Sequence, residues 1–595
     1  MNKKLTSITK TISGIRPFIA PYKWQFIGAI VMVILSVVAM VLAPSVEGMI
    51  TTQLADDITL AESLGGLQIQ FDAIIKILVI LALIYLVKTL SQVFAITWLT
   101  NAIQHAMRDL RNALQNKIRR LPVRYFDNHP FGDVLSRITN DVDAISNALQ
   151  QSFVNVVSGI LTITLALIMM IRISPLMALI AFMIIPLSLL ITIFIVTRSQ
   201  KRFQAQQDAL GALNGAITEM YTGYNEILLF NKQEDSIEKF KKLNEHLRSN
   251  ACKAQFISST IGPLNSLVTY LTIGTVAVVG TFQILAGNIS VGNLQAFVRY
   301  IWQVNDPLSQ ISSLSSQIQA AFAAMERVME ILNEEEEIAE LDPPKHIENM
   351  KGNVSFKHVR FGYGETDLMK DLNIEVKSGQ MVAIVGPTGA GKTTLINLLL
   401  RFYDVRGGSI CIDGVDIRDM KRGELRDMFG MVLQDTWLFS GSIYDNIRYG
   451  RLNARKDEII AVAKMANVHH FIRTLPDGYH SLVNEEANNI SQGEKQLLTI
   501  ARAILKDPKI LILDEATSSV DTRLEKMIQE AMHRVMEGRT SFVIAHRLST
   551  IRNADLILVM NHGDIIEQGT HEELLAKKGF YEKLYNSQFA DAEIE

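Results

Sequence analysis

Long runs of uncharged, mostly apolar residues fill the first half of the chain. A helix that crosses a bilayer needs about 20 such residues. Continuous runs of that length lie at 24–46, 144–171 and 173–197, and a weaker one, at 77–99, is interrupted by Lys88. A further uncharged stretch, 254–298, is divided by the turn-forming residues 287–292, so it predicts a fifth span and the start of a sixth. The pattern therefore predicts six membrane crossings.

Basic residues orient these spans. No Lys or Arg lies between Lys23 and Lys76, whereas both residue types crowd the segments after the second and fourth spans. These residues are Arg108, Arg111, Lys117, Arg119, Arg120, Arg124 and Arg137 in the first segment, and Arg198, Lys201, Arg202, Lys239, Lys241 and Lys242 in the second. Loops rich in Lys and Arg stay in the cytoplasm, so both segments and the N-terminus are expected there.

The composition changes near residue 320. Residues 321–337 form a charged helical pattern, and Asp342-Pro343-Pro344 is expected to stop the helix. We expect a transmembrane domain over 1–320, a linker over 321–350 and a soluble domain over 351–595. The chain has 58 basic and 61 acidic residues, which gives no indication of a nucleic-acid partner. Its two cysteines, Cys252 and Cys411, predict neither a disulfide framework nor a zinc site.

A glycine-rich loop carries the first candidate chemistry. It reads Gly386-Pro387-Thr388-Gly389-Ala390-Gly391-Lys392-Thr393-Thr394, between a strand-like run at 381–385 and a helix-like run at 395–400. Glycines in this context let backbone N–H groups converge on phosphate at a helix N-terminus. Lys392 supplies a cation for the β- and γ-phosphates, and the Thr393 hydroxyl can bind magnesium. The alternative is a chance loop, but the strand before it and the helix after it favour a nucleotide site.

A second apolar strand, 510–513, ends in two carboxylates. Asp514 is expected to hold magnesium, directly or through water, and Glu515 to polarise or orient an attacking water. A buried strand can end in Asp-Glu by accident, but the phosphate loop makes phosphoryl chemistry the better interpretation.

Three further motifs, 489–496, 514–521 and Ala545-His546-Arg547, closely resemble those of ATP-binding cassette (ABC) transporters. With six spans ahead of one cassette, the chain resembles a half-transporter of the type IV (exporter) class over essentially all of its length. Residues 132–143 and 219–223 resemble the two cytoplasmic loops whose coupling helices touch the cassettes. The resemblance implies a six-span α-helical transmembrane domain followed by an α/β P-loop (RecA-like) ATP-binding cassette with a helical subdomain.

The resemblance also implies roles for single residues. Tyr363 would stack on adenine. Glu515, His546 and Gln434 would be catalytic, with His546 on the γ-phosphate and Gln434 sensing magnesium and the attacking water. ATP and Mg²⁺ are the implied cofactors, with Thr393, Gln434 and Asp514 around the metal. Asp521 would lie in the loop that crosses to the partner, and Glu485 in the segment that reports to the membrane domain.

The signature motif departs from the family's usual Leu-Ser-Gly-Gly-Gln, because the aligned residues are Ile490, Ser491, Gln492, Gly493 and Glu494. Ser491 and Gly493 can still bind the γ-phosphate of ATP held by the opposite cassette. Gln492 adds bulk where backbone approaches phosphate, and Glu494 places a carboxylate at an anion site. Since Glu515 is intact, the motif resembles that of one subunit of a heterodimeric bacterial multidrug exporter with one degenerate site. The alternative is a harmless variant in a homodimer.

Ionisable residues at membrane depth usually face the interior or water, so Lys88, Arg299 and Asp306 are candidates for a substrate cavity. Arg299 and Asp306 are seven residues apart, on one helical face. Met and Phe side chains can repack around amphipathic drugs, although they can equally face lipid. The candidates of this kind are Met40, Phe94, Met169, Met170, Phe182, Phe194 and Phe282.

We therefore expect an ATP-driven exporter of small amphipathic compounds, a multi-pass protein of the cytoplasmic (inner) membrane with its cassette in the cytoplasm. Its expected partners are a second half-transporter chain, the lipid bilayer and the substrate, without nucleic acid. A lipid or peptide exporter is the alternative within this class. An ATP-gated channel or a regulatory nucleotide-binding module is the alternative from another class.

Overall fold

The computed structural model describes residues 13–64, 69–433, 436–484, 489–514, 522–545 and 548–589. Contacts within the chain divide it into two compact units. The first comprises Met1–Leu121 and His129–Glu335, and the second comprises Pro122–Asn128 and Glu336–Glu595. Each unit has its own apolar core, so the two are described separately.

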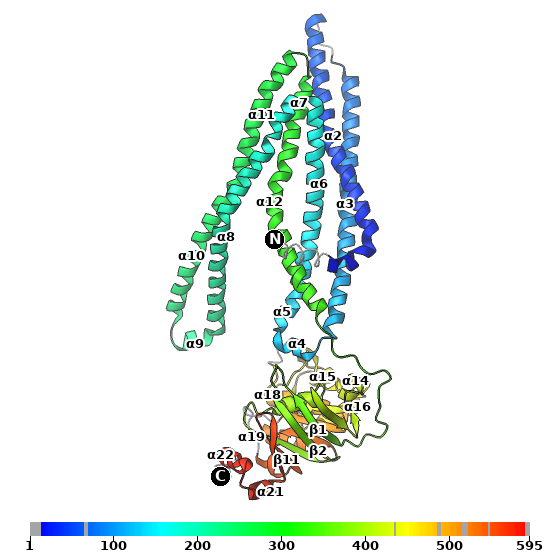
Figure 1. Cartoon of the computed structure of the whole chain (residues 1–595), viewed down its shortest axis with the longest axis vertical. Helices are drawn as coiled ribbons and strands as arrows, with labels where there is room; N and C mark the ends of the chain where they lie inside the picture. Colours follow the sequence, from blue (N-terminus) through cyan, green and yellow to red (C-terminus); the bar gives the residue numbers. More distant parts are fainter. Residues whose placement is uncertain are drawn as a thin grey trace. The chain divides into compact units, whose positions relative to one another are not determined.

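The described part of the first unit is helical (Figure 1). Its elements are η1 (Ala20–Tyr22), α2 (Lys23–Leu64), α3 (Phe71–Ile118), α5 (Phe131–Ser136), the π-helical turn η2 (Arg137–Asp141), α6 (Val142–Ile173), α7 (Pro175–Phe182), α8 (Ile184–Thr222), α9 (Tyr224–Leu229), α10 (Gln233–Ser259), α11 (Ile261–Leu285) and α12 (Val291–Asn333). Helix α2 packs along α3 and α12, and α6 packs along α12. Helices α8 and α10 lie side by side and are joined through α9.

Five helical stretches in the described part of the chain are long and apolar enough to cross a membrane. They are Ser13–Leu60, Phe71–Ile118, Phe131–Ile173, Pro175–Thr222 and Gln233–Leu285. The expected sixth span corresponds to α12, whose 43 residues extend over about 64 Å at 1.5 Å per residue. Helix α12 is more polar because it carries Arg299, Asp306 and many Ser and Gln residues. Composition thus supports five spans, and length supports the sixth.

The turn predicted at residues 287–292 separates α11 from α12 as expected. Its Ser290 side chain accepts a hydrogen bond from the Asn293 backbone N–H at 3.2 Å and so caps α12. The predicted end of α12 is wrong, because the helix stops at Asn333, ahead of Asp342-Pro343-Pro344. Four consecutive glutamates, 334–337, follow Asn333. Negative charges at a helix C-terminus oppose the helix dipole and repel each other, which explains the early stop.

The second unit contains a four-stranded antiparallel sheet, a six-stranded sheet, a two-stranded ribbon and surrounding helices. Its strands are β1 (Val354–Phe361), β2 (Met369–Val376), β3 (Met381–Val385), β4 (Gly407–Ile412), β5 (Val415–Asp416), β6 (Phe429–Val432), β7 (Gly441–Ser442), β8 (Leu482–Val483), β9 (Ile510–Asp514), β10 (Thr540–Ile544), β11 (Leu556–Asn561) and β12 (Asp564–Gly569). Its helices are α4 (Val123–Asn128), α13 (Lys392–Leu399), α14 (Arg422–Asp427), α15 (Ile443–Arg448), α16 (Lys456–Met465), α17 (His469–Thr474), η3 (Gly478–His480), α18 (Gln492–Lys506), α19 (Thr522–Met536), α20 (Leu548–Arg552), α21 (His571–Ala576) and α22 (Phe580–Phe589).

The six-stranded sheet has the order β12-β11-β3-β10-β9-β6, and only β12 runs antiparallel to its neighbour. Strands β3, β9 and β10 are almost entirely buried, which fits their continuous apolar sequences. Helices α15 to α18 share a separate apolar cluster and form a helical part of the unit. Because the five parallel strands end at one edge, the loops that follow them meet there, where open α/β sheets bind ligands.

Candidate nucleotide site

Strand pairing brings the predicted phosphate loop and the predicted magnesium-binding carboxylate to the same edge of the sheet. Strand β10 lies between β3 and β9, and its Ile544 pairs with Ile384 on one side and with Asp514 on the other. The glycine-rich loop follows β3, and Asp514 is the last residue of β9. The loop and the first carboxylate of the Asp-Glu pair are therefore separated by a single strand.

Two glycines of the loop are required by its geometry. Gly391 has φ +100° directly before α13, a left-handed conformation that L side chains rarely adopt. At Gly386 a Cβ atom would lie 2.3 Å from the Met560 carbonyl oxygen. The loop consequently turns tightly into α13, whose first backbone N–H groups have no partner within the helix and can bind an anion.

The Lys392 side chain contacts the backbone of this loop. Its Nζ donates hydrogen bonds to the carbonyl oxygens of Gly386, at 2.7 Å, and Pro387, at 3.1 Å. Burial lowers the pKa of Lys392, and the nearby negative charge of Asp514 acts in the opposite direction. Charged phosphate oxygens are stronger acceptors than neutral carbonyls, so the ammonium can exchange these two bonds for phosphate contacts.

The two threonines that follow Lys392 differ in exposure. Thr393 is exposed in the first turn of α13, and Thr394 is buried. Asp514 is half-buried at the end of β9. Thr393 and Asp514 thus supply oxygen atoms at the edge where magnesium was expected.

An aromatic cluster adjoins the loop. Tyr363 is 42% exposed, and its ring lies edge-to-face against Phe361 and Tyr403, with 5.0 Å between ring centroids in both pairs. The Tyr363 hydroxyl donates a hydrogen bond to Thr394 Oγ1 at 3.2 Å. Tyr363 therefore presents a fixed, accessible ring beside the first turn of α13, which suits stacking against a nucleotide base.

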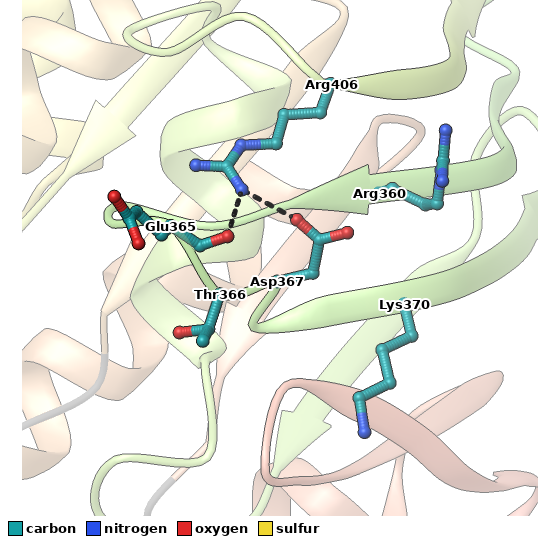
Figure 2. Close-up of a pocket in the computed structure, with 6 residues that line it drawn as sticks. All are labelled: Arg360, Glu365, Thr366, Asp367, Lys370 and Arg406. Carbon is teal, nitrogen blue, oxygen red and sulfur yellow. Dashed lines mark hydrogen bonds and ion pairs between the residues drawn. The ribbon is translucent and has the colours of Figure 1, made fainter.

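Arg406 fastens the segment that carries Tyr363. Figure 2 shows its guanidinium directed at this segment, where it donates to the Glu365 carbonyl oxygen at 3.3 Å and to Asp367 Oδ1 at 2.8 Å. It also donates to the Gly364 carbonyl oxygen. The Arg360 side chain lines the same hollow but points away from the segment. Sequence reasoning missed Arg406, because its contact with residues 364–367 depends on the pairing of β4 with β1.

The signature segment forms the N-terminus of α18, where Ser491 and Glu494 bond to each other. Glu494 Oε2 accepts from the Ser491 backbone N–H at 3.1 Å and from the Ser491 hydroxyl at 2.6 Å. Ser491 Oγ in turn accepts from the Glu494 N–H at 3.4 Å. The sequence Ser491-x-x-Glu494 matches a capping box, so this contact could have been read from the sequence. Both donors that Ser491 could offer to phosphate point to Glu494.

Gln492 and Gly493 complete the signature segment. Gln492 is exposed, and its Nε2 donates to Thr436 Oγ1 at 3.4 Å, whereas Gly493 is buried. Five other predicted residues, Gln434, Glu485, Glu515, Asp521 and His546, lie outside the described residues, and their roles stay predictions.

The structure separates the three candidate cavity residues of the helical unit. Lys88 and Asp306 line one cavity of about 270 Å³, formed by α2, α3, α6 and α12. Arg299 does not line it, and its Nε lies 3.7 Å from Glu47 Oε2. Met40 also lines the cavity, whereas Met170 is packed in the core of the unit.

Four of the five aromatic and methionine candidates that remain lie on exposed positions. Phe94, Phe182, Phe194 and Phe282 have at least half of their surface exposed. Met169 packs, partly buried, against the core of the unit. Whether any of these side chains contacts substrate stays a prediction.

Known protein families match both units. Residues 26–308 match the family described as ABC transporter transmembrane region, and residues 369–518 match the family described as ABC transporter. A fatty acid ABC transporter ATP-binding/permease protein of Mycobacterium bovis is 45% identical over 532 residues, which cover 88% of this chain and 84% of the relative.

Two other relatives carry different names. An ATP-dependent lipid A-core flippase of Syntrophus aciditrophicus is 35% identical, over 86% of this chain and 85% of the relative. A Staphylococcus aureus protein, provisionally named as a multidrug export ATP-binding/permease protein, is 35% identical over 96% of this chain and 98% of the relative. The solved structure of a bacterial Atm1-family ABC exporter with ATP bound superposes with a TM-score of 0.74 at 28% identity, over 96% of this chain and 99% of that one.

Proposed function

The chain belongs to the ABC transporters, and from this membership we propose that it is one half of an ATP-driven exporter that moves amphipathic compounds outward across the cytoplasmic membrane. One observation carries the proposal. A phosphate loop with Lys392 and a carboxylate at Asp514 share one sheet edge, in a chain whose other unit consists of helices long and apolar enough to span a membrane.

The residues of this edge fit ATP with Mg²⁺. The α13 N-terminus and Lys392 would hold the phosphates, Tyr363 would stack on the base, and Thr393 and Asp514 would contact the metal. Mg²⁺ would neutralise part of the negative charge on the phosphates. On the basis of their motifs, we assign activation of the attacking water to Glu515. We assign contact with the γ-phosphate to His546 and sensing of magnesium and the water to Gln434.

Amphipathic character is the substrate property that two of the relatives share. Fatty acids and lipid A combine polar heads with long apolar chains, and these are the compounds that two relatives are named for. The cavity that holds Lys88 and Asp306 also combines charged and apolar lining. This supports export of amphipathic compounds, including drug-like ones, and lipid export lies within the same class.

We further propose that the chain works beside a different second chain. Glu494 accepts hydrogen bonds from both the hydroxyl and the backbone N–H of Ser491. In a dimer, these two donors of Ser491 would face the partner's ATP. A carboxylate repels phosphate, so this half-site disfavours ATP, whereas the chain's own phosphate loop is intact. Expression of this chain alone tests the pairing, because a stable homodimer with full ATPase activity and transport would contradict it.

The ATPase assignment is tested with the purified complex in lipid nanodiscs. We expect ATP hydrolysis that amphipathic compounds stimulate, and near-complete loss of hydrolysis in Lys392→Ala, because that variant removes the cation for the β- and γ-phosphates. Undiminished hydrolysis in Lys392→Ala would show that this loop does not form the working site.

A further inference from the structure

The cavity in the helical unit has chemically distinct walls. Helix α12 contributes Gln303 and Asp306, and α3 contributes Lys88 and Gln92. Valines and methionine of α2 and small or polar residues of α6 complete the lining: Val33, Val37 and Met40, with Asn155, Ser158, Gly159 and Thr162. The carboxylate therefore lies on α12, and the cation lies on α3.

The acceptors on α12 form a small group. Gln303 Nε2 donates to the Met40 carbonyl oxygen at 3.1 Å, which fixes the amide, and its Oε1 is buried without a hydrogen-bond partner. Asp306 lies three residues further along, on the same face of α12. A buried acceptor without a partner costs free energy, and a ligand ammonium would supply both oxygens with a donor.

Lys88 provides the opposite charge. Its Nζ lies 5.9 Å from the centre of the Tyr85 ring, and its backbone carbonyl accepts from the Ser36 hydroxyl at 3.2 Å. Within the described part of the chain, neither Lys88 nor Asp306 forms an ion pair, with the other or with a third residue. Charges at membrane depth normally find a partner, so two uncompensated charges on one cavity indicate a ligand with both signs.

The size of the cavity limits what it can enclose. Pockets for whole drug-sized ligands measure about 300–1,000 Å³, and this cavity is smaller, at about 270 Å³. Ile96 lines the cavity and is also 49% exposed, so an apolar tail can leave the cavity along α3. A polar headgroup fits inside, with its tail outside.

We propose that this cavity binds the headgroup of a zwitterionic amphiphile, with the ammonium at Gln303 and Asp306 and the phosphate or carboxylate at Lys88. The proposal rests on the export function and narrows its substrate class. Asp306 would repel a headgroup that carries only a negative charge, and Lys88 would repel a headgroup that carries only a positive charge.

The test compares three amphiphiles with a dodecyl tail: dodecylphosphoethanolamine, dodecanoate and dodecylammonium. The ammonium groups of the first and third probes carry N–H donors, as the proposed contact requires. Each is added below its micelle-forming concentration to the complex in nanodiscs, and the concentration that gives half-maximal ATPase stimulation is measured. The wild type should respond to the zwitterion at a lower concentration than to either other probe. Lys88→Met should raise the half-maximal concentration of the zwitterion at least tenfold and make the cation the more potent probe. Asp306→Asn should raise that concentration similarly and make the anion the more potent probe.

Arg299→Met is the matched control, because Arg299 lies on α12 outside the cavity. It should leave the order of the three probes unchanged. Equal effects of Lys88→Met and Asp306→Asn on all three probes, or no change in their order, would overturn the proposal. If the wild type transported none of the probes into inverted vesicles, the export function itself would be refuted.

A second measurement leaves the charged residues in place. In a Cys252→Ser background, which removes the exposed cysteine, Ser158→Cys reports on the α6 wall. The zwitterion should protect this cysteine from a thiol reagent more strongly than the other two probes do. Equal protection by all three, or none by any, would contradict the proposed headgroup.

Discussion

At the scale of single residues, the nucleotide site depends on side chains that hold other groups in place. Lys392 is bound by carbonyl oxygens of its own loop, and Tyr363 is held by Thr394 and two aromatic rings. The Arg406 guanidinium bonds to residues 364–367 and not to the Tyr363 ring, so it acts on that ring from outside. Such prearranged contacts reduce the ordering that ATP binding would otherwise require.

Arg406→Ala is expected to raise the KM for ATP about three- to tenfold and leave kcat nearly unchanged. The loosened segment would lose part of the roughly 1–3 kcal/mol that stacking on an aromatic ring contributes. Steady-state ATPase kinetics measure the split. Arg360→Ala is the control, since its side chain lines the same hollow without bonding to residues 364–367. A lower kcat with an unchanged KM would place Arg406 in the chemical step instead.

At the scale of elements, two described helices of the second unit begin with a capping box that pairs a hydroxyl residue with a glutamate. In α18 the pair is Ser491 and Glu494, and in α21 it is Thr570 and Glu573. Glu573 Oε2 accepts from the Thr570 N–H at 3.0 Å, as Glu494 does from Ser491 at 3.1 Å. The chain therefore contains a control for the signature helix that has the same local chemistry.

Glu494→Gln is expected to lower the ATP concentration for half-maximal nucleotide occlusion about two- to fivefold. This corresponds to the roughly 0.3–1 kcal/mol of a charge at a helix N-terminus, which no longer opposes phosphate. Glu573→Gln should cost similar helix stability and leave occlusion unchanged. Equal effects of the two substitutions on occlusion would mean that the charge acts only on helix stability.

The hairpin turn between β4 and β5 makes stability depend on pH. Asp413 and Gly414 both have left-handed backbone, and the Asp413 carboxylate accepts from the backbone N–H groups of Lys351, Gly352 and Asn353. Burial, the largest influence, acts to raise the pKa of Asp413, but these hydrogen bonds together outweigh it and leave the pKa below its usual value. The stabilisation is therefore complete above the pKa of an unfolded Asp and is lost as the pH falls through the folded value.

Asp413→Asn is accordingly expected to lower the thermal transition of the second unit at neutral pH, by the equivalent of about 1–3 kcal/mol. The difference from the wild type should close in acid, because both side chains are then neutral. Scanning calorimetry between neutral and acidic pH measures it, with Glu348→Gln as the control at an exposed carboxylate nearby. A difference that persists unchanged in acid would rule out the charged hydrogen bonds as its source.

Local patterns in the sequence predicted most of these elements. The apolar runs, the turn at 287–292 and the phosphate loop each depend on neighbouring residues, and the structure contains all three. Helix α12 ends ahead of the prolines because repulsion among the glutamates at 334–337 stops it first. Arg406 could not be found, because its partners meet it only through strand pairing. The charges of the helical unit were predicted as one set, yet packing divides Lys88 and Asp306 from Arg299.

At the scale of the whole molecule, the two units serve different parts of the proposed transport cycle: the first faces the membrane, and the second binds ATP. The most apolar stretch of α3 has none of its residues buried within the chain, so this stretch is free to face lipid or another chain. The second unit offers an intact phosphate loop and a signature helix closed by Glu494. In the proposed pairing with a different second chain, these features would give two unequal sites and couple cassette closure to a change of access across the membrane.

The most direct test of the account is ATP-driven uptake of a labelled amphiphile into inverted membrane vesicles that contain the chain with its partner. We expect uptake that requires hydrolysable ATP and falls at least tenfold in Glu515→Gln while ATP binding persists. Positioned side chains of this kind contribute roughly 10²–10⁴-fold to rate. Steady ATP hydrolysis without uptake, or equal uptake by the wild type and Glu515→Gln, would contradict an ATP-driven exporter and favour a channel or regulatory module.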